Sequence, residues 1–220
     1  YVVGGSVRDV ILGKEPKDWD ITTNARPEQI MEVLPDSKYE NVFGTVIVPI
    51  RDGEALTAVV EVTTYRSERG YSDHRRPDEV TFEDKLENDL ARRDFTINAL
   101  AMGLDKKIVD LFGGEKDINK RIIRTVGEPE DRFKEDALRM LRAVRFSCQL
   151  KFDIEPKTER NIQKFAGTIK FIANERIRDE LIKILSSDRP AEGVRKLQET
   201  KLLNYIIPEL EEGIGMAQNH

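Results

Sequence analysis

Two aspartates separated by one residue, Asp18 and Asp20, are the side chains of this sequence best suited to catalysis. Side chains alternate faces along a strand, so a strand through this segment would point both carboxylates the same way. Two neighbouring carboxylates repel each other unless a cation lies between them, and oxygen ligands suit Mg²⁺ held jointly with a phosphate. The spacing therefore predicts a magnesium site at Asp18 and Asp20. The ordinary alternative is a solvated turn.

The segment just before these aspartates has the features of a phosphate site. An apolar run over residues 1–3 is interrupted by Gly4 and Gly5, and Ser6 then caps a short helix that Gly13 is predicted to close. Glycine lets backbone N–H groups approach a phosphate, and a helix presents its positive end to it. Together with the aspartates, this stretch indicates a nucleoside triphosphate bound with a metal.

A third carboxylate, Glu61, stands inside the apolar strand predicted over residues 58–65, and we take it as a candidate catalytic residue. The alternative is an edge-strand charge that faces water. The sequence contains no Walker A motif and no protein-kinase signature. Two aspartates without a Walker lysine favour nucleotidyl transfer, in which two metal ions activate a hydroxyl and stabilise the leaving pyrophosphate.

An arginine pair, Arg92 and Arg93, lies near the start of a helix predicted over residues 88–102. A guanidinium near a triphosphate neutralises charge in a fixed fork geometry, so Arg93 is a candidate nucleotide ligand. The alternative is a surface arginine pair held by Asp94.

A second helix, predicted over residues 132–150, carries Asp136, Arg139, Arg142 and Arg145 at every third position. These side chains would lie next to one another along the helix. A carboxylate beside a guanidinium matches the amine donor and ring-nitrogen acceptor of cytosine and adenine, and mismatches uracil and guanine. The alternative is an ordinary intrahelical ion pair, worth only about 0.3–0.5 kcal/mol.

Composition bounds the class of protein. The chain has 220 residues, of which 39% are hydrophobic and 35% charged. It lacks the run of about 20 apolar residues that a membrane span requires. One cysteine and two histidines exclude internal disulfides and a His/Cys zinc site, and fit a reducing compartment such as the cytoplasm. Residues 1–112 hold 15 Lys and Arg against 22 Asp and Glu, whereas residues 120–183 hold 16 against 11. The basic part is suited to phosphates.

The order of predicted elements indicates an α+β fold. Strands and helices alternate up to the glycine pair Gly113-Gly114, and the remainder reads as helices. A hairpin is predicted around Asp52-Gly53. We expect a catalytic part over residues 1–112, a helical part over 113–170 and a second over 171–220. Because the chain opens inside an apparent strand, we expect that its natural N-terminus is missing.

Five motifs, in this order, resemble those of the class II tRNA nucleotidyltransferases (CCA-adding enzymes) and bacterial poly(A) polymerases. They span nearly the whole chain: residues 4–9 with 18–20, residues 92–99, residues 110–114 with Arg124, residues 135–139, and residues 175–181. The resemblance implies a polymerase-beta-like nucleotidyltransferase head with a mixed sheet, followed by an all-helical neck and body. It implies Mg²⁺ at Asp18 and Asp20, triphosphate contacts from Gly5 and Arg8, and nucleotide contacts from Arg93, Asp136, Arg139, Arg142 and Arg145. It leaves the role of Glu61 open.

The implied activity is template-independent addition of C and A to the 3′ end of tRNA from CTP and ATP, with no membrane partner. CC-only addition, A-only addition and poly(A) synthesis are alternatives within the family. The segment over residues 68–77 resembles the flexible element associated with adding A, so we expect A addition. A non-catalytic RNA binder is disfavoured by the intact aspartate pair, and an antibiotic-modifying enzyme by the long basic helical half. The sequence does not predict the oligomeric state.

Overall fold

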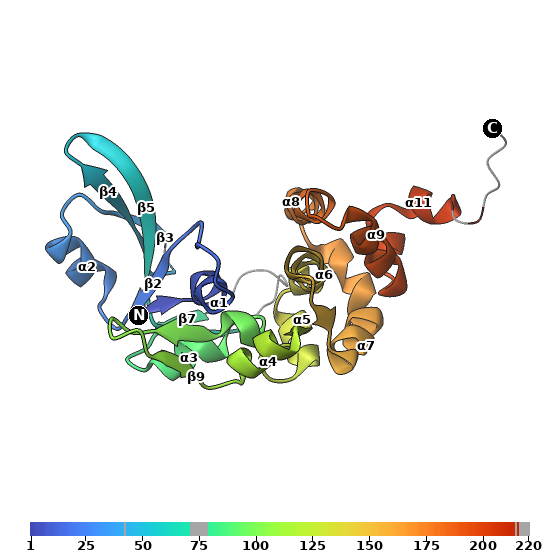
Figure 1. Ribbon diagram of the computed structural model, residues 1–220, viewed down its shortest axis with the longest axis horizontal. Helices are drawn as coiled ribbons and strands as arrows, with labels where there is room; N and C mark the ends of the chain where they lie inside the picture. Colours follow the sequence, from blue (N-terminus) through green and yellow to red (C-terminus); the bar gives the residue numbers. More distant parts are fainter. Residues whose placement is uncertain (42, 71–78, 214, 216–220) are drawn as a thin grey trace. The chain divides into compact units, whose positions relative to one another are not determined.

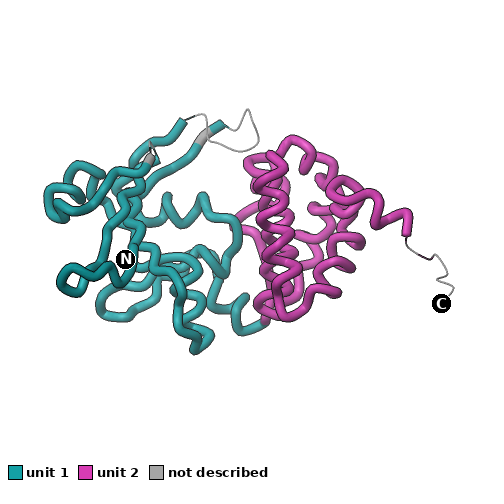
Figure 2. The backbone as a smooth tube through the Cα atoms, turned by 90° about the horizontal axis from the view of Figure 1, so that it is seen from above, with its two compact units in different colours: residues 1–70, 77–120 teal, residues 71–76, 121–220 magenta. Residues whose placement is uncertain are grey.

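The computed structural model describes residues 1–41, 43–70, 79–213 and 215. They divide into two compact units, shown in teal and magenta in Figure 2. The first contains the described residues of Tyr1–Gly70 and Pro77–Lys120, and the second those of Arg121–His220. The predicted α+β fold is confirmed, because the first unit is built on a seven-stranded mixed sheet and the second is mainly helical. In the described part of the chain, no helix has the length and apolar character needed to cross a membrane.

The sheet of the first unit has the strand order β3-β4-β5-β2-β1-β8-β9. Figure 1 shows β4 and β5 as its long hairpin. Only the pairing of β2 with β5 is parallel, and it sets Asp20 opposite Glu61. The strands are β1 (Val2–Val3), β2 (Asp20–Thr23), β3 (Lys38–Asn41), β4 (Thr45–Asp52), β5 (Ala55–Thr64), β8 (Leu100–Met102) and β9 (Ile108–Asp110).

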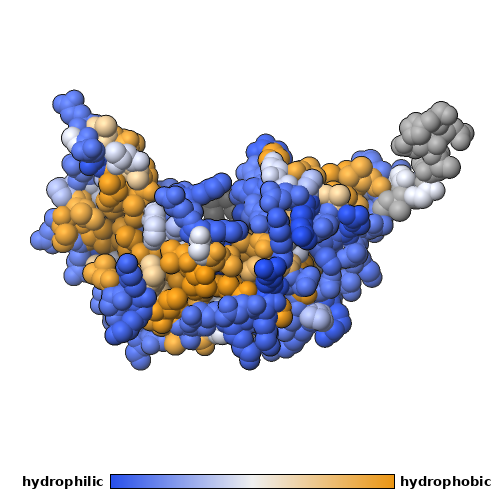
Figure 3. Space-filling model, in the orientation of Figure 1, coloured by the Kyte–Doolittle hydropathy of each residue, from blue (hydrophilic) through white to orange (hydrophobic). Residues whose placement is uncertain are grey.

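The hairpin predicted around Asp52-Gly53 is confirmed as β4 and β5, with Gly53 at a positive φ of 60° in the turn. Near its base, buried valines of both strands pack against Ile30 of α2 (Pro27–Val33). Figure 3 shows apolar residues gathered over this hairpin, whose exposed large hydrophobic side chains are Ile50, Leu56 and Val59.

The helix predicted over residues 88–102 is wrong beyond its first turns. The chain instead forms α3 (Leu86–Ala91), the 3₁₀ turn η1 (Thr96–Asn98) and strand β8. Asp94 provides the local reason, because its carboxylate accepts hydrogen bonds from the backbone N–H of Phe95 at 2.8 Å and from the side chain of Asn98 at 3.3 Å. Such side-chain bonds compete with the helical pattern. Pairing of β8 with β1 and β9 then stabilises an extended chain.

The other elements of the first unit surround this sheet. They are α1 (Gly5–Ile11), the two-stranded ribbon of β6 (Arg66–Arg69) and β7 (Glu79–Phe82), and α4 (Gly114–Lys120). Helix α1 begins at Gly5, and Ser6 is not its cap as predicted. The Ser6 hydroxyl donates to the Val3 carbonyl at 3.0 Å and so ties the helix to β1.

The second unit packs around α6 (Leu138–Leu150), which buries Met140, Leu141 and Val144 among others. The continuous helix predicted over residues 132–150 is wrong, because it breaks at Asp136, which has extended backbone. The Asp136 carboxylate accepts a hydrogen bond from the backbone N–H of Leu138 at 3.0 Å, a local bond that competes with the helical pattern. The remaining elements are β10 (Ile122–Ile123), α5 (Pro129–Glu135), β11 (Asp153–Ile154), α7 (Pro156–Phe165), η2 (Ala166–Phe171), α8 (Asn174–Leu185), α9 (Pro190–Glu199), α10 (Leu203–Ile206) and α11 (Pro208–Glu212).

Candidate active site

The parallel pairing of β2 with β5 brings two of the predicted catalytic carboxylates together. Asp20 begins β2, and its register partner in β5 is Glu61. Paired residues of neighbouring strands project to the same face of a sheet. Asp18 lies in a bend before β2, so the prediction that a strand carries both aspartates is wrong. Its negative charge nonetheless raises the pKa of both Asp20 and Glu61, which places it within electrostatic reach of each.

The electrostatics of this carboxylate group favour a bound cation. Partial burial raises the pKa of Asp20, Arg93 opposes this shift, and Asp18 adds to it. Partial burial also raises the pKa of Glu61, and the charges of Asp20, Glu40 and Asp18 raise it further. Neither the Asp20 carboxylate nor the Glu61 carboxylate has a hydrogen bond or ion pair with any residue that the structure describes. A divalent ion would relieve this repulsion.

These donors fit a hard divalent cation shared with a substrate. All are carboxylate oxygens, the ligand type that Mg²⁺ prefers. Among the residues described, no three His, Cys, Asp or Glu side chains are arranged to hold a metal ion by themselves. A metal at Asp18 and Asp20 would therefore take its other ligands from phosphate and water, as is usual for Mg²⁺.

Gly4 lies close to the side chains of Asp20 and Arg93. It has a positive φ of 76°, a backbone conformation that residues with a side chain rarely adopt. A Cβ atom built on Gly4 would lie 2.9 Å from Arg93 Nη1 and 3.8 Å from Asp20 Oδ2. Only glycine therefore leaves this space open beside the carboxylate and the arginine.

Arg8, a predicted triphosphate ligand, is a buried residue of α1. Its Nε donates to Asp9 at 2.9 Å and its Nη1 to the Asn98 side chain at 2.8 Å. Gly5, the other predicted ligand, is its close neighbour, since a Cβ on Gly5 would lie 3.4 Å from Arg8 Nη2. The contacts with Asp9 and Asn98 fix the guanidinium beside the start of α1.

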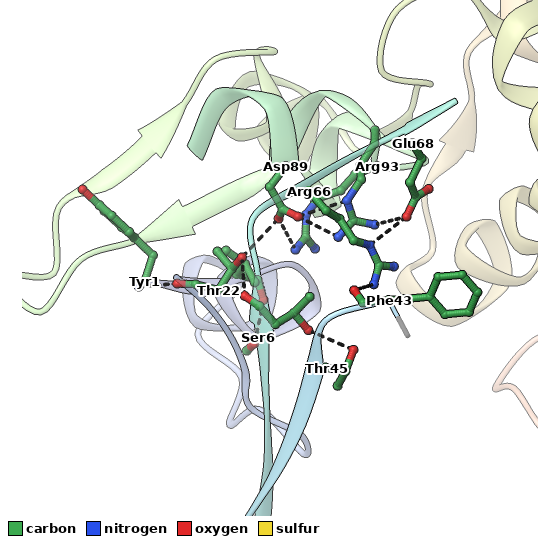
Figure 4. A network of polar contacts seen from close by, with 12 residues as sticks. Tyr1, Ser6, Thr22, Phe43, Thr45, Arg66, Glu68, Asp89 and Arg93 are labelled. Atoms are coloured by element: carbon green, nitrogen blue, oxygen red, sulfur yellow. Dashed lines mark hydrogen bonds and ion pairs between the residues drawn. The ribbon is translucent and has the colours of Figure 1, made fainter. Parts of the chain in front are cut away.

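Arg93 is not part of a surface pair held by Asp94, the alternative considered from the sequence. Asp89 of α3 binds it instead, and the same carboxylate binds Arg92 (Figure 4). Sequence reasoning missed Asp89, although a signal existed. Aspartate three and four positions before two arginines is the spacing at which helical side chains meet. Glu68 and Arg66 of β6 extend this network and were also missed, because nothing in their local pattern links them to α3.

In the second unit, opposite charges hold the two predicted base-reading residues. Arg176 of α8 donates to both oxygens of Asp136, at 2.7 and 3.4 Å. Arg139, near the start of α6, pairs with Glu135. The side chains of Asp136 and Arg139 thus project from the same turn of backbone, and each is held by its own ion-pair partner. Sequence reasoning missed Arg176 as the partner of Asp136, because the two are 40 residues apart.

The other two arginines of this series share an aromatic neighbour. The guanidinium carbons of Arg142 and Arg145 lie 5.3 and 4.3 Å from the centre of the Phe146 ring. Arg145 also forms an ion pair with the buried Glu180 of α8 at 2.9 Å, so it joins α6 to α8. A nucleotide contact by either arginine stays a prediction.

Comparison with known families decides the class of protein. Residues 1–124 match the poly A polymerase head domain, and residues 151–214 match the probable RNA and SrmB-binding site of polymerase A. The chain belongs to the tRNA nucleotidyltransferase and poly(A) polymerase family. This confirms the family that the five motifs indicated, and with it the nucleotidyltransferase head. Members of the family typically use a divalent metal.

Individual relatives agree with this membership. The chain is 52% identical to the CCA-adding enzyme of Lactobacillus helveticus over 84% of its length and 45% of that protein. It is 48% identical to the CCA-adding enzyme of Bacillus cytotoxicus over 94% of its length and 51% of that protein. The Bacillus stearothermophilus CCA-adding enzyme in complex with CTP has a similar structure, with a TM-score of 0.83 and 44% identity over 92% of this chain and 48% of that one. The chain therefore spans about half the length of these relatives.

Proposed function

We propose that this family member adds C and A to the 3′ end of tRNA from CTP and ATP without a nucleic-acid template. The observation that carries the proposal is the group of Asp18, Asp20 and Glu61 beside Arg93, a repelling set of carboxylates next to a partly buried guanidinium. The relatives support the choice of reaction, since they are CCA-adding enzymes, one of them in complex with CTP.

The first unit would carry the chemistry. Asp18 and Asp20 would hold Mg²⁺, which lowers the pKa of the attacking hydroxyl and stabilises the leaving oxygen when it is bound. Gly5, Arg8 and Arg93 would orient the triphosphate, so that the 3′ hydroxyl of the RNA attacks the α-phosphate in line and pyrophosphate leaves. Glu61 would add negative charge to the metal site from the neighbouring strand.

The second unit would select the base. Asp136 would accept a hydrogen bond from the exocyclic amine of cytosine or adenine, and Arg139 would donate to the adjacent ring nitrogen. Their partners Arg176 and Glu135 hold both groups before a base arrives, which reduces the entropy lost on binding. Arg142 and Arg145 would complete the nucleotide contacts.

The wider assignment follows from the same proposal. We infer a head over residues 1–112, a neck over 113–170 and a body over 171–220, acting on tRNA in the cytoplasm. A addition rests on the segment over residues 68–77, of which residues 71–77 lie outside those that the structure describes.

The test is incorporation into a tRNA that ends before CCA, with the full-length protein and with CTP alone, ATP alone, or both. Addition of CC from CTP, and of the final A only when ATP is also present, is the expected result. Addition that stops after CC would identify a CC-only enzyme, and long A tracts from ATP alone a poly(A) polymerase. No incorporation from any mixture would contradict the proposal.

A further inference from the structure

A completely buried carboxylate, Asp89, lies at the centre of the polar network in Figure 4. Its Oδ1 accepts two hydrogen bonds from Arg92, from Nε at 3.0 Å and Nη2 at 2.7 Å. Its Oδ2 accepts one from Arg93 Nη2 at 3.2 Å and lies 3.4 Å from the Thr22 hydroxyl, which shares its one proton between Asp89 and the Thr63 carbonyl at 3.1 Å. Burial alone would raise the pKa of Asp89, but the charges of Arg92 and Arg93 outweigh it and lower the pKa, so the group is an anion.

The bond to Thr22 gives this carboxylate a geometric role. Thr22 belongs to β2, the strand that begins with Asp20, and lies two residues beyond it. One carboxylate oxygen of Asp89 therefore contacts both Arg93 and the strand that carries a predicted metal ligand. Moving Asp89 would change the position of Arg93 relative to Asp20.

A second carboxylate, that of Glu68, holds Arg92 in place beside Asp89. Glu68 Oε1 accepts from Arg92 Nη1 at 3.1 Å and from Arg66 Nε at 2.8 Å, and the Glu68 side chain is only 8% exposed. Arg66 in turn donates to the carbonyl of Phe43, between β3 and β4. Buried charges are tolerated when each is paired, and removing one partner of such a group is costly. The row Arg66, Glu68, Arg92, Asp89 thus fixes the carboxylate that holds Arg93.

Arg93, the last residue of this row, has N–H groups that Asp89 does not bind. Its Nε is buried and has no hydrogen-bond partner in the part of the chain that the structure describes. Its Nη1 faces the open space at Gly4, and its charge lowers the pKa of Asp20. A buried donor without a partner is costly, so a ligand oxygen at this point would be favoured.

We propose that Asp89 is a positioning residue for nucleotide binding, which sets the Arg93 guanidinium at a fixed place between Gly4 and Asp20, with Glu68 and Arg92 fixing Asp89. Asp89 itself does not touch the nucleotide. The inference rests on the proposed function and adds to it the residues through which β2, α3 and β6 orient the arginine.

A double-mutant cycle on the full-length protein tests this. Equilibrium binding of CTP and the KM for CTP are measured for wild type, Asp89→Asn, Arg93→Met and the double variant. Asp89→Asn is expected to weaken CTP binding about 10- to 100-fold, as loss of a supporting contact does at other sites. In the Arg93→Met background the same change is expected to have no further effect, because Asp89 acts through Arg93. Additive losses, or unchanged binding by Asp89→Asn, would overturn the proposal.

A second variant covers the case in which Asp89→Asn does not fold. Glu68→Gln alters the far end of the row and is expected to weaken CTP binding less than Asp89→Asn, again with no effect once Arg93 is replaced. Asp84→Asn is the matched control, because Asp84 is an exposed partner of Arg26 outside this network. Its CTP affinity is expected to equal that of wild type.

Failure of the inference and failure of the proposed function are distinguishable. A wild-type protein that binds CTP but adds no nucleotide to tRNA would contradict the reaction, and the binding cycle would still test Asp89. An active wild type with an additive cycle would contradict the inference alone. A wild type that binds no nucleoside triphosphate would overturn both.

Discussion

One pair of carboxylates in the first unit, Asp20 and Glu61, contrasts with one pair in the second unit, Asp136 and Glu180. In the first unit, Asp20 and Glu61 lie opposite each other on neighbouring strands, and the Asp20 charge raises the pKa of Glu61. Neither carboxylate has a hydrogen bond or ion pair with a described residue. In the second unit, Asp136 and Glu180 are each paired with an arginine, at 2.7 and 2.9 Å. An unpaired acidic group has a favourable interaction left for a cation from outside. A paired one presents a fixed hydrogen-bonding edge. Under the proposed function, this difference distinguishes the proposed metal site from the proposed base-reading site.

Neutralising one unpaired carboxylate is expected to have the largest effect on activity. Asp20→Asn removes a proposed metal ligand, and we expect nucleotide incorporation to fall by at least about 100-fold, since loss of even an indirect ligand contact costs about 10- to 100-fold. Stability should not fall, because the change also removes repulsion with Asp18 and Glu61. Single-turnover incorporation and thermal unfolding measure the two effects. Retained activity would contradict the metal site.

Neutralising a paired carboxylate is expected to lower the stability of the fold. Glu180→Gln removes the anion that lies 2.9 Å from the Arg145 guanidinium, whose side chain is 12% exposed. Breaking a buried pair by removing one member costs about 3 kcal/mol or more. Urea unfolding would measure this loss. Asp179→Asn, at an exposed neighbour paired with Arg178, is the control and should change stability by no more than about 1 kcal/mol. An equal loss of stability in Glu180→Gln and Asp179→Asn would contradict the special role of the buried pair.

A smaller effect is expected on base choice. Asp136→Asn replaces the proposed acceptor for the cytosine amine with a group that can also donate, so discrimination against UTP should fall. A charge-assisted hydrogen bond contributes about 1.5–3 kcal/mol, which corresponds to about 10- to 100-fold in selectivity. The ratio of CTP to UTP incorporation measures it. Unchanged selectivity would show that the Asp136 carboxylate only accepts from the Leu138 backbone and pairs with Arg176.

The smallest effect concerns titration of the unpaired group. Without metal, Asp20 and Glu61 should titrate above the ordinary pKa values of 3.8 and 4.5. A carboxyl with a raised pKa in the folded state stabilises the fold when protonated, and this contribution is lost as pH rises through that pKa. Asp18→Asn should lower both pKa values, since the Asp18 charge raises them. Carboxyl-carbon NMR titration would detect the shifts, and an unchanged Glu61 would place Asp18 too far away to act with it.

The sequence alone was sufficient for the α+β class, the hairpin at Asp52-Gly53 and the family. Each rests on local pattern: strand periodicity, a turn dipeptide, or short motifs in a fixed order. Local pattern misled where a polar side chain bonds its own backbone. Asp94 and Asp136 both lie in segments with helical periodicity, and each interrupts the helix by accepting a backbone N–H. Periodicity records which positions are apolar, and does not reveal that competition.

Pairings between distant segments were decided only by the tertiary structure. Nothing in the residues around Glu61 indicates that β5 would run parallel to β2 with Asp20 opposite, and nothing around Glu68 or Arg176 names Arg92 or Asp136 as a partner. Side-chain type and spacing determined which groups this protein has for binding metal, phosphate and base. Strand register and helix packing determined which of those groups repel and which are paired, because charge interactions depend on distances that the chain order does not contain.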